Sequence, residues 1–234
     1  MKERGLWATH LGAHLGGPGF GQVKLASLNE ILGRSECAPI VFGSQAPDSG
    51  NSEILAHFGT PELKARYLEP LLDNRIVSCF SMTEPQGGAD PKVFTTTAVQ
   101  DGDEWVINGE KWFSSFADIA SFLIVMAVTD PDAPPYEQQS MFVVPRETPG
   151  INVLRNVGLG YEPIGGGREG ERQNASHELW KCAAASWDRI LIPPRKGLGA
   201  SGIRLVHRPV RLQRYYGVLA GRICIYQHEP ADPV

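Results

Sequence analysis

The sequence lacks any long uninterrupted apolar run, and none of its stretches approaches the roughly eighteen residues of a membrane-spanning helix. It is also poor in cysteine: its four cysteines are widely spaced and form no CxxC pair. This spacing argues against a disulfide framework and favours reduced, structural thiols. The charged N-terminus has no apolar signal-peptide segment. These absences predict a cytoplasmic protein without a membrane helix.

The chain has 234 residues, of which 42% are hydrophobic, enough for one large or two small domains. The net charge of −4 argues weakly against a nucleic-acid partner. The charges are unevenly distributed: residues 1–164 carry 11 basic and 20 acidic side chains, whereas residues 165–234 carry 11 and 6. Such a change in composition indicates a domain boundary, a tail, or a change of reading frame or exon.

The first 75 residues predict short helices joined by loops. Apolar residues at helical spacing occur over 25–32, and Gly33 follows them as a C-cap. A second helix is expected to begin at Asn51 or Ser52 and to end before Gly59. The dipeptide at 60–61 has the pattern of an N-cap followed by proline at the first helical position, and Pro70 is expected to end this helix.

After residue 75 the pattern changes to short strands. Asn108-Gly109 favours a type I′ hairpin turn. Regular short strands predict a compact antiparallel β-barrel or sandwich over residues 76–164, and hence an α+β fold. The expected strands are 93–99, 105–107, 121–128, 141–144 and 151–154.

The last region, 165–234, predicts a basic tail rich in Gly, Pro and Arg that is poorly ordered. Its beginning has the composition of a linker. Residues 190–192 suggest a strand, and two prolines follow them directly. The apolar residues between 218 and 225 are compatible with one more short element.

Two segments carry the strongest functional pattern. In the first, a strand-like start at residue 78 passes into a Pro/Gly-rich turn that ends at Asp90. Such turns leave backbone N–H groups free to face a ligand, and the Thr83 hydroxyl adds a donor for the edge of a flavin ring. For these residues taken alone, an ordinary strand-to-loop transition is the favoured interpretation.

The second segment runs from Lys111 to Ser115 and places aromatic residues before two hydroxyls. Aromatic rings pack against planar cofactors, and serine can donate to a ring nitrogen. The alternative is a set of core aromatics at a strand end.

Other motifs favour simpler interpretations. His10 and His14 have helical metal-ligand spacing, but glycines surround them and no third ligand is apparent, so no metal site is predicted. The GxGxxG at 197–202 follows prolines instead of a clean strand, which argues against a dinucleotide fold. The basic run at 204–214 favours a solvated face over an anionic partner such as RNA or acidic lipid. For Glu84, a structural role is favoured over that of a general base.

In linear order these motifs resemble the acyl-CoA dehydrogenase family over about residues 5–160. Met82-Thr83-Glu84-Pro85 and the stretch from Ile107 to Trp112 resemble its middle-domain signatures, and glycine-rich 16–21 resembles its early loop. The closest branch is similar to acyl-CoA dehydrogenase family member eleven. The resemblance implies an N-terminal helical domain, a middle β-domain and a C-terminal four-helix domain.

The resemblance also implies FAD as cofactor, an acyl-CoA thioester as substrate, electron-transferring flavoprotein as electron acceptor, and a homo- or hetero-oligomer. In the family reaction, a glutamate removes the α-proton while a hydride passes to the flavin. No nucleic-acid or membrane partner is implied. Ala89 stands where the family often has serine. Carried over by position, the cofactor-binding residues are Phe80, Ser81, Met82, Thr83, Gly88, Ala89, Phe113, Ser114 and Ser115.

The ends depart from the family pattern. The N-terminal helical region (1–75) is expected to be truncated, and the four-helix domain with its catalytic glutamate is expected to be absent, so no catalytic residue is assigned. Residues 165–234 are expected to derive from another reading frame or exon. The sequence therefore predicts a catalytically impaired relative of the flavoenzymes. The alternative is a non-catalytic flavin- or acyl-CoA-binding subunit that completes a partner's site.

Overall fold

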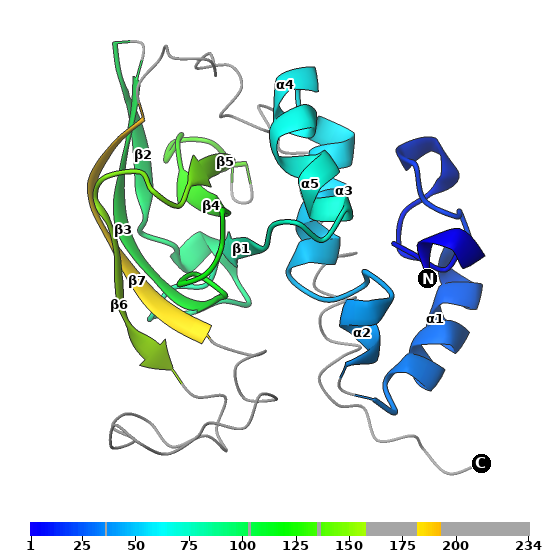
Figure 1. Ribbon diagram of the computed structural model, residues 1–234. Helices are drawn as coiled ribbons and strands as arrows, with labels where there is room; N and C mark the ends of the chain where they lie inside the picture. The colour runs from blue at the N-terminus through cyan, green and yellow to red at the C-terminus, as the bar shows by residue number, and fades with distance from the viewer. Residues whose placement is uncertain (36, 103, 135–136, 158–181, 193–234) are drawn as a thin grey trace.

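The computed structural model describes residues 1–35, 37–102, 104–134, 137–157 and 182–192. Its helices occupy one side of the molecule and its strands the other, and the N-terminus lies in the helical half (Figure 1). The helical elements are η1 Lys2–Arg4, η2 Ala13–Leu15, α1 Gly21–Leu32, α2 Ala38–Val41, α3 Asp48–Phe58, α4 Pro61–Leu63, the π-helical turn η3 Lys64–Leu68, α5 Glu69–Leu72 and η4 Pro91–Val93. None of the helices in these ranges is long and apolar enough to cross a membrane.

The strands form one sheet in the order β1-β4-β2-β3-β7-β6, with β5 paired to β4. Most pairs are antiparallel, as expected, but β1 runs parallel to β4 from Ser78–Phe122 to Ser81–Val125. The sheet is therefore mixed. The strands are β1 Ser78–Ser81, β2 Thr97–Asp101, β3 Glu104–Ser115, β4 Phe122–Val128, β5 Gln139–Pro145, β6 Ile151–Val157 and β7 Cys182–Ile192.

The strand β4 lies at the centre of the core. Its residues alternate between two apolar clusters: Leu123 and Val125 pack with Trp105 and Phe142, whereas Phe122 and Ile124 pack with side chains of α3 to α5. In Figure 1, β4 and β5 accordingly lie between the helices and the strands β2, β3, β6 and β7. A strand buried on both faces requires a continuous apolar run, which is why the sequence identifies it correctly.

Several local expectations are confirmed. Helix α1 ends at Leu32 with Gly33 after it, and the Thr60 side chain accepts a hydrogen bond from the backbone N–H of Leu63. Proline at 70, however, does not end the helix. The chain passes through the π-helical turn η3 and continues as α5 with Pro70 in its first turn, where a missing N–H costs least.

The hairpin turn expected at Asn108-Gly109 is wrong, because β3 continues through both residues. Gly109 instead forms part of an irregularity in the pairing with β7 and has φ 153°. A Cβ there would meet backbone and side-chain atoms of Thr96, so glycine serves a close approach of two strands. The hairpin closes earlier, where Asp101 pairs with Glu104.

The tail expected at 165–234 contains one element of the sheet. β7 pairs on one side with β3 and on the other with β6. Residues 182–192 therefore form a strand of the sheet, longer than the 190–192 suggested by the sequence, and the expected poor order of the tail stays a prediction. The first half of β7 is Cys-Ala-Ala-Ala-Ser, a run with little strand propensity of its own. Pairing on both edges therefore decides the conformation of this strand. The other residues of 165–234, including the GxGxxG and the basic run, lie outside the described ranges.

Candidate functional site: two joined loops at a sheet edge

The two sequence segments singled out above lie side by side. The Ser81 hydroxyl, at the end of β1, is 3.0 Å from the Ser114 hydroxyl near the end of β3. One step further along, the backbone N–H of Trp112 donates to the carbonyl of Thr83 at 2.8 Å. The segments are separated by about thirty residues in sequence, so these bonds bring the predicted donors and aromatics to one edge.

A bulge in β3 sets the direction of the aromatic residues. The pairing with β7 shifts register between Lys111 and Ser114, so the regular ladder is interrupted at residues 112–113. Phe113 has φ 53° and its side chain is 44% exposed, which is unusual for a large aromatic residue. Bulges and positive φ values at bulky residues concentrate at functional sites, and this one presents an aromatic ring at the surface.

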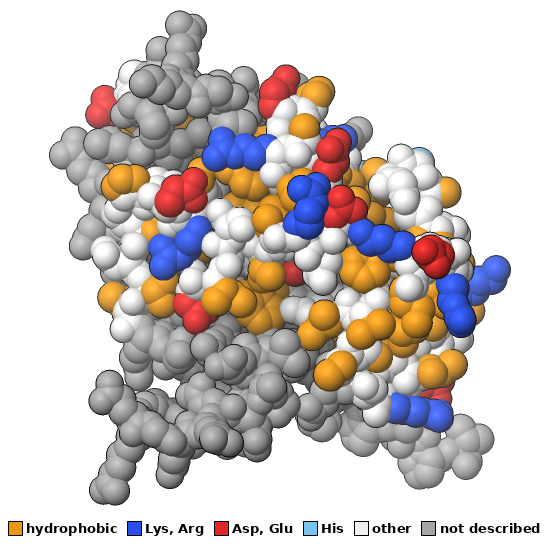
Figure 2. Space-filling model, in the orientation of Figure 1, with side chains coloured by type: hydrophobic (Ala, Val, Ile, Leu, Met, Phe, Trp, Pro, Cys, Tyr) orange, Lys and Arg blue, Asp and Glu red, His pale blue; other side chains and the backbone are white. Residues whose placement is uncertain are grey.

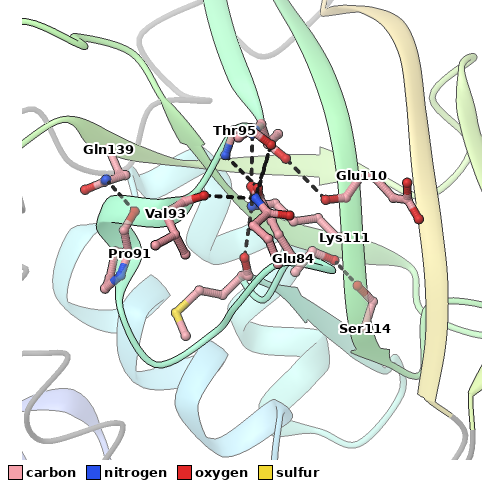
Figure 3. Close-up of polar contacts among 12 residues, drawn as sticks. Glu84, Pro91, Val93, Thr95, Glu110, Lys111, Ser114 and Gln139 are labelled. Atoms are coloured by element: carbon pink, nitrogen blue, oxygen red, sulfur yellow. Dashed lines mark hydrogen bonds and ion pairs between the residues drawn. The ribbon is translucent and has the colours of Figure 1, made fainter.

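The turn after β1 is held by a buried carboxylate, that of Glu84, whose side chain is fully buried. It forms an ion pair with Lys111 at 2.7 Å, and Lys111 also donates to the Met82 carbonyl at 2.9 Å. The backbone N–H groups of Thr95 and Thr96 donate to the same carboxylate at 2.6 and 3.0 Å. Figure 3 shows these contacts converging on Glu84 from β3 and from the segment before β2.

The electrostatics of this cluster favour an ionised pair. Burial alone would raise the pKa of Glu84, but the Lys111 ammonium and the hydrogen bonds outweigh it and bring that pKa to about 2. Burial lowers the pKa of Lys111 to about 8, against the opposing attraction of Glu84. Both groups therefore carry charge at neutral pH. Glu84 is fully engaged and cannot serve as a free base, which agrees with the structural role favoured from sequence.

The loop between Glu84 and Asp90 is tight. Glu84 and Gly87 exchange two backbone hydrogen bonds of 2.9 and 3.0 Å, and a Cβ at Gly88 would lie 2.8 Å from the Thr83 side chain. Glycine is thus required where the loop folds back over Thr83. The Thr83 residue is half-buried, and its hydroxyl takes part in none of the side-chain hydrogen bonds of the described part of the chain, so it is available to a ligand.

The nine predicted cofactor residues divide into two groups. Those with solvent access are Phe80, Met82, Thr83, Gly88, Ala89, Phe113 and Ser115. Ser81 and Ser114 are fully buried and face each other. Half-buried Phe80 also packs against the apolar cluster of the helices. The two serine side chains therefore have a supporting position, and the contact of all nine residues with a cofactor stays a prediction.

Sequence reasoning missed the importance of Lys111 and of the Thr95-Thr96 backbone. The sequence places Lys111 in an aromatic segment and in a family signature, but nothing local marks it as buried. A fully buried lysine requires a partner, so its position in a strand between Ile107 and Trp112 was the one available signal.

The side chains of His10 and His14, which have metal-ligand spacing in the sequence, contact different residues. His10 lies 2.9 Å from the Ser52 hydroxyl, and the His14 ring packs against His57. Across the described ranges there is no group of three or more His, Cys, Asp or Glu side chains that could hold a metal ion.

Models of two domains match the chain: the N-terminal domain of acyl-CoA dehydrogenase over residues 1–75 and its middle domain over residues 79–167. The chain belongs to the acyl-CoA dehydrogenase family. The second match contains both segments of the candidate site. It also ends near the position where the charge of the sequence changes sign, although the precise division into domains stays a prediction.

Curated relatives agree with this assignment. The chain is 45% identical over 160 residues to "Probable acyl-CoA dehydrogenase FadE2" of Mycobacterium tuberculosis. The aligned region covers 67% of this chain and 39% of that protein. It is 41% identical over 172 residues to acyl-CoA dehydrogenase family member 11 of Gallus gallus, covering 71% of this chain and 22% of the relative. The branch suggested by the sequence is therefore among its relatives.

A third relative bears on the expected tail. Acyl-CoA dehydrogenase family member 10 of Mus musculus is 37% identical over 227 residues, covering 92% of this chain and 21% of the relative. A match of that extent includes most of residues 165–234. Together with the place of β7 in the sheet, this argues against a tail unrelated to the family. The chain spans well under half the length of all three relatives.

Solved structures show the same fold. A Mycobacterium abscessus protein classed as an acyl-CoA dehydrogenase has a TM-score of 0.77 and 34% identity, covering 96% of this chain and 51% of that one. A glutaryl-CoA dehydrogenase from Mycobacterium smegmatis, solved in complex with FADH2, has a TM-score of 0.64 at 22% identity, covering 91% of this chain and 48% of that one. At 22% identity, the similarity to the Mycobacterium smegmatis structure shows only that the two chains share a fold.

Proposed function

We propose that the chain binds FAD at the edge formed by the turn after β1 and the bulge of β3. The observation that carries this proposal is the bond between Trp112 and Thr83, which brings an unpaired hydroxyl next to an exposed aromatic ring. A flavin needs these two elements: donors for its pyrimidine edge and an apolar face for its rings. Membership of the family and the FADH2 in a protein of the same fold support the choice of cofactor.

In this proposal some residues contact the flavin and others hold the two loop segments in place. Thr83 and the neighbouring backbone N–H groups donate to the ring edge, and Phe113 packs against its face. Ser81 and Ser114 do not touch the ring but fasten the two segments to each other. Glu84 and Lys111 keep the turn closed. When bound, FAD supplies the hydride acceptor for dehydrogenation of an acyl-CoA thioester, the reaction proposed for the whole protein.

In that reaction the substrate proton needs a base, and Glu84 is committed to Lys111. We therefore assign the base to a group outside the two loop segments, either elsewhere in the protein or on a partner subunit. Electron-transferring flavoprotein is the proposed acceptor of the electrons. The alternative, a flavin-binding subunit without its own base, is supported by the full engagement of Glu84.

Titration of the purified chain with FAD, followed by quenching of flavin fluorescence, tests the proposed cofactor. Thr83→Val removes the hydroxyl and keeps the shape of the side chain, so the dissociation constant is expected to rise about tenfold. The matched control is Thr97→Val, at an exposed position on β2, which should leave the constant unchanged. A chain that binds no FAD, or equal constants for both variants, would overturn the proposal.

Anaerobic addition of an acyl-CoA to the FAD-loaded chain separates the two catalytic alternatives. Loss of flavin absorbance indicates that a base is present in the chain. If the flavin absorbance is retained with the chain alone but is lost after a full-length family member is added, the result supports a subunit that completes a partner's site. Retained absorbance under both conditions supports a binding function without dehydrogenation.

A further inference from the structure

A cleft lies at one end of the parallel pair β1–β4, opposite to the end that carries the candidate flavin edge. Its residues precede β1 and β4, follow β5 or belong to the turn η3, whereas the candidate flavin edge lies beyond the end of β1. The cleft is open and has a volume of about 430 Å³. It is lined by Arg66, Tyr67, Ile76, Ala120, Ser121, Arg146 and Glu147. Side chains of both signs and apolar side chains are interspersed on the face of the molecule in Figure 2.

Tyr67 gives the cleft an unpaired donor. Its side chain is only 4% exposed and its ring packs on Phe122 with centroids 4.6 Å apart. Its hydroxyl is buried and forms no hydrogen bond of good geometry with a described residue, and the Arg66 guanidinium carbon lies 5.1 Å from the centre of its ring. Burial raises the pKa of Tyr67, Arg66 opposes the rise and Glu147 adds to it, so the hydroxyl stays protonated at neutral pH. A buried hydroxyl without a partner is costly unless a ligand or water completes it.

Two guanidinium groups line the same cleft. Arg146 is anchored, because its Nε donates to the Ala117 carbonyl at 2.7 Å and its backbone N–H donates to Ser121 at 3.1 Å. Its terminal nitrogens have no hydrogen-bond partner within the described ranges. Arg66 approaches Glu147 only at 3.9 Å, and both side chains are largely exposed. Such a surface pair is weak, and the contact of the guanidinium with the face of the Tyr67 ring does not neutralise its charge.

We propose that this cleft binds a small oxyanion of the phosphate or carboxylate type. An oxyanion accepts several hydrogen bonds at once, and Arg66, Tyr67 and Arg146 supply donors from both the helical and the sheet side of the cleft. Glu147 is the one acidic group in the lining, and it opposes the anion. The proposal is independent of the flavin edge, which shares none of these residues.

Isothermal titration of the full chain with inorganic phosphate and, separately, with acetate tests this site and distinguishes the two oxyanion types. Ionic strength is held constant with chloride. Arg66→Met is expected to weaken binding of the preferred anion about tenfold, because a charge-assisted hydrogen bond is lost. Glu147→Gln is expected to tighten binding severalfold, because the opposing charge is removed.

Tyr67→Phe keeps the ring packing and removes only the hydroxyl, so it provides a folded variant in which affinity should fall severalfold. Arg75→Gln is the matched control, because it removes an exposed arginine outside the cleft and should leave affinity unchanged. Absence of heat with both anions would overturn the proposal. Equal weakening by Arg66→Met and Arg75→Gln would overturn it too, since that result indicates a general charge effect. Binding that Tyr67→Phe leaves unchanged would likewise exclude this site.

Discussion

The strand β4 and the loop around Glu84 are both buried, but different forces hold them. β4 is surrounded by apolar side chains on both faces, and each fully buried Leu, Ile or Phe contributes about 1.5–3 kcal/mol independently of pH. The Glu84 loop is held by one ion pair and by hydrogen bonds from the backbone of Thr95 and Thr96. The first region tolerates loss of buried apolar volume poorly, whereas the second tolerates changes of charge poorly.

This difference separates the scaffold from the site. Apolar burial is non-directional, so β4 can be built from many Val, Ile, Leu and Phe combinations. Hydrogen bonds are directional, so the Glu84 cluster fixes the position of Thr83 relative to the bulge at Phe113. We infer that the geometry of the flavin edge depends on the polar cluster, and that stability depends on both regions.

The largest expected effect comes from breaking the ion pair on one side. Glu84→Gln leaves the Lys111 ammonium buried without a counter-charge, and we expect it to lower the free energy of unfolding by about 3–5 kcal/mol in urea titrations. The double variant Glu84→Gln/Lys111→Met should recover most of this loss. Glu110→Gln, an exposed carboxylate on the same strand as Lys111, is the control and should change stability by less than about 0.5 kcal/mol.

A loss below about 1 kcal/mol for Glu84→Gln would contradict the importance assigned to the pair. Failure of the double variant to recover stability would show that the hydrogen bonds to Thr95 and Thr96, and not the charge of Lys111, make the larger contribution.

A second effect, roughly 3 kcal/mol, is expected from acid. The pKa of Glu84 is lowered from 4.5 to about 2 in the folded chain, so its contribution is fully present above pH 4.5 and is lost as the pH falls toward 2. Urea titrations at several pH values across this window measure how steeply the free energy of unfolding depends on pH. The core variant Leu123→Ala should be less stable at every pH but keep the slope, whereas Glu84→Gln/Lys111→Met should lose part of it. Equal slopes in all three proteins would contradict the distinction between the two regions.

The smallest effect concerns a contact that belongs to neither region. Thr60→Ala removes the cap on the Leu63 N–H and should lower the free energy of unfolding by about 1 kcal/mol, with no dependence on pH and no effect on FAD binding. Thermal or urea unfolding measures the first and flavin titration the second. A change in flavin affinity here would indicate that the helices and the site are coupled.

The sequence by itself determined the elements whose cause is local. The apolar run at β4, the cap at Thr60, the glycine after α1 and the motif residues at Thr83 and Phe113 were all identifiable, because side-chain periodicity and turn chemistry act between near neighbours. The family assignment also followed from linear order.

Only the tertiary structure decided the rest. It continued β3 through Asn108-Gly109, placed β7 between β3 and β6, and buried Lys111 against Glu84, 27 residues away. Each of these outcomes depends on pairing between segments far apart in the chain. Backbone hydrogen bonds on a strand edge and the desolvation of a charge depend on partners that the local sequence does not contain, so no pattern of near neighbours encodes them.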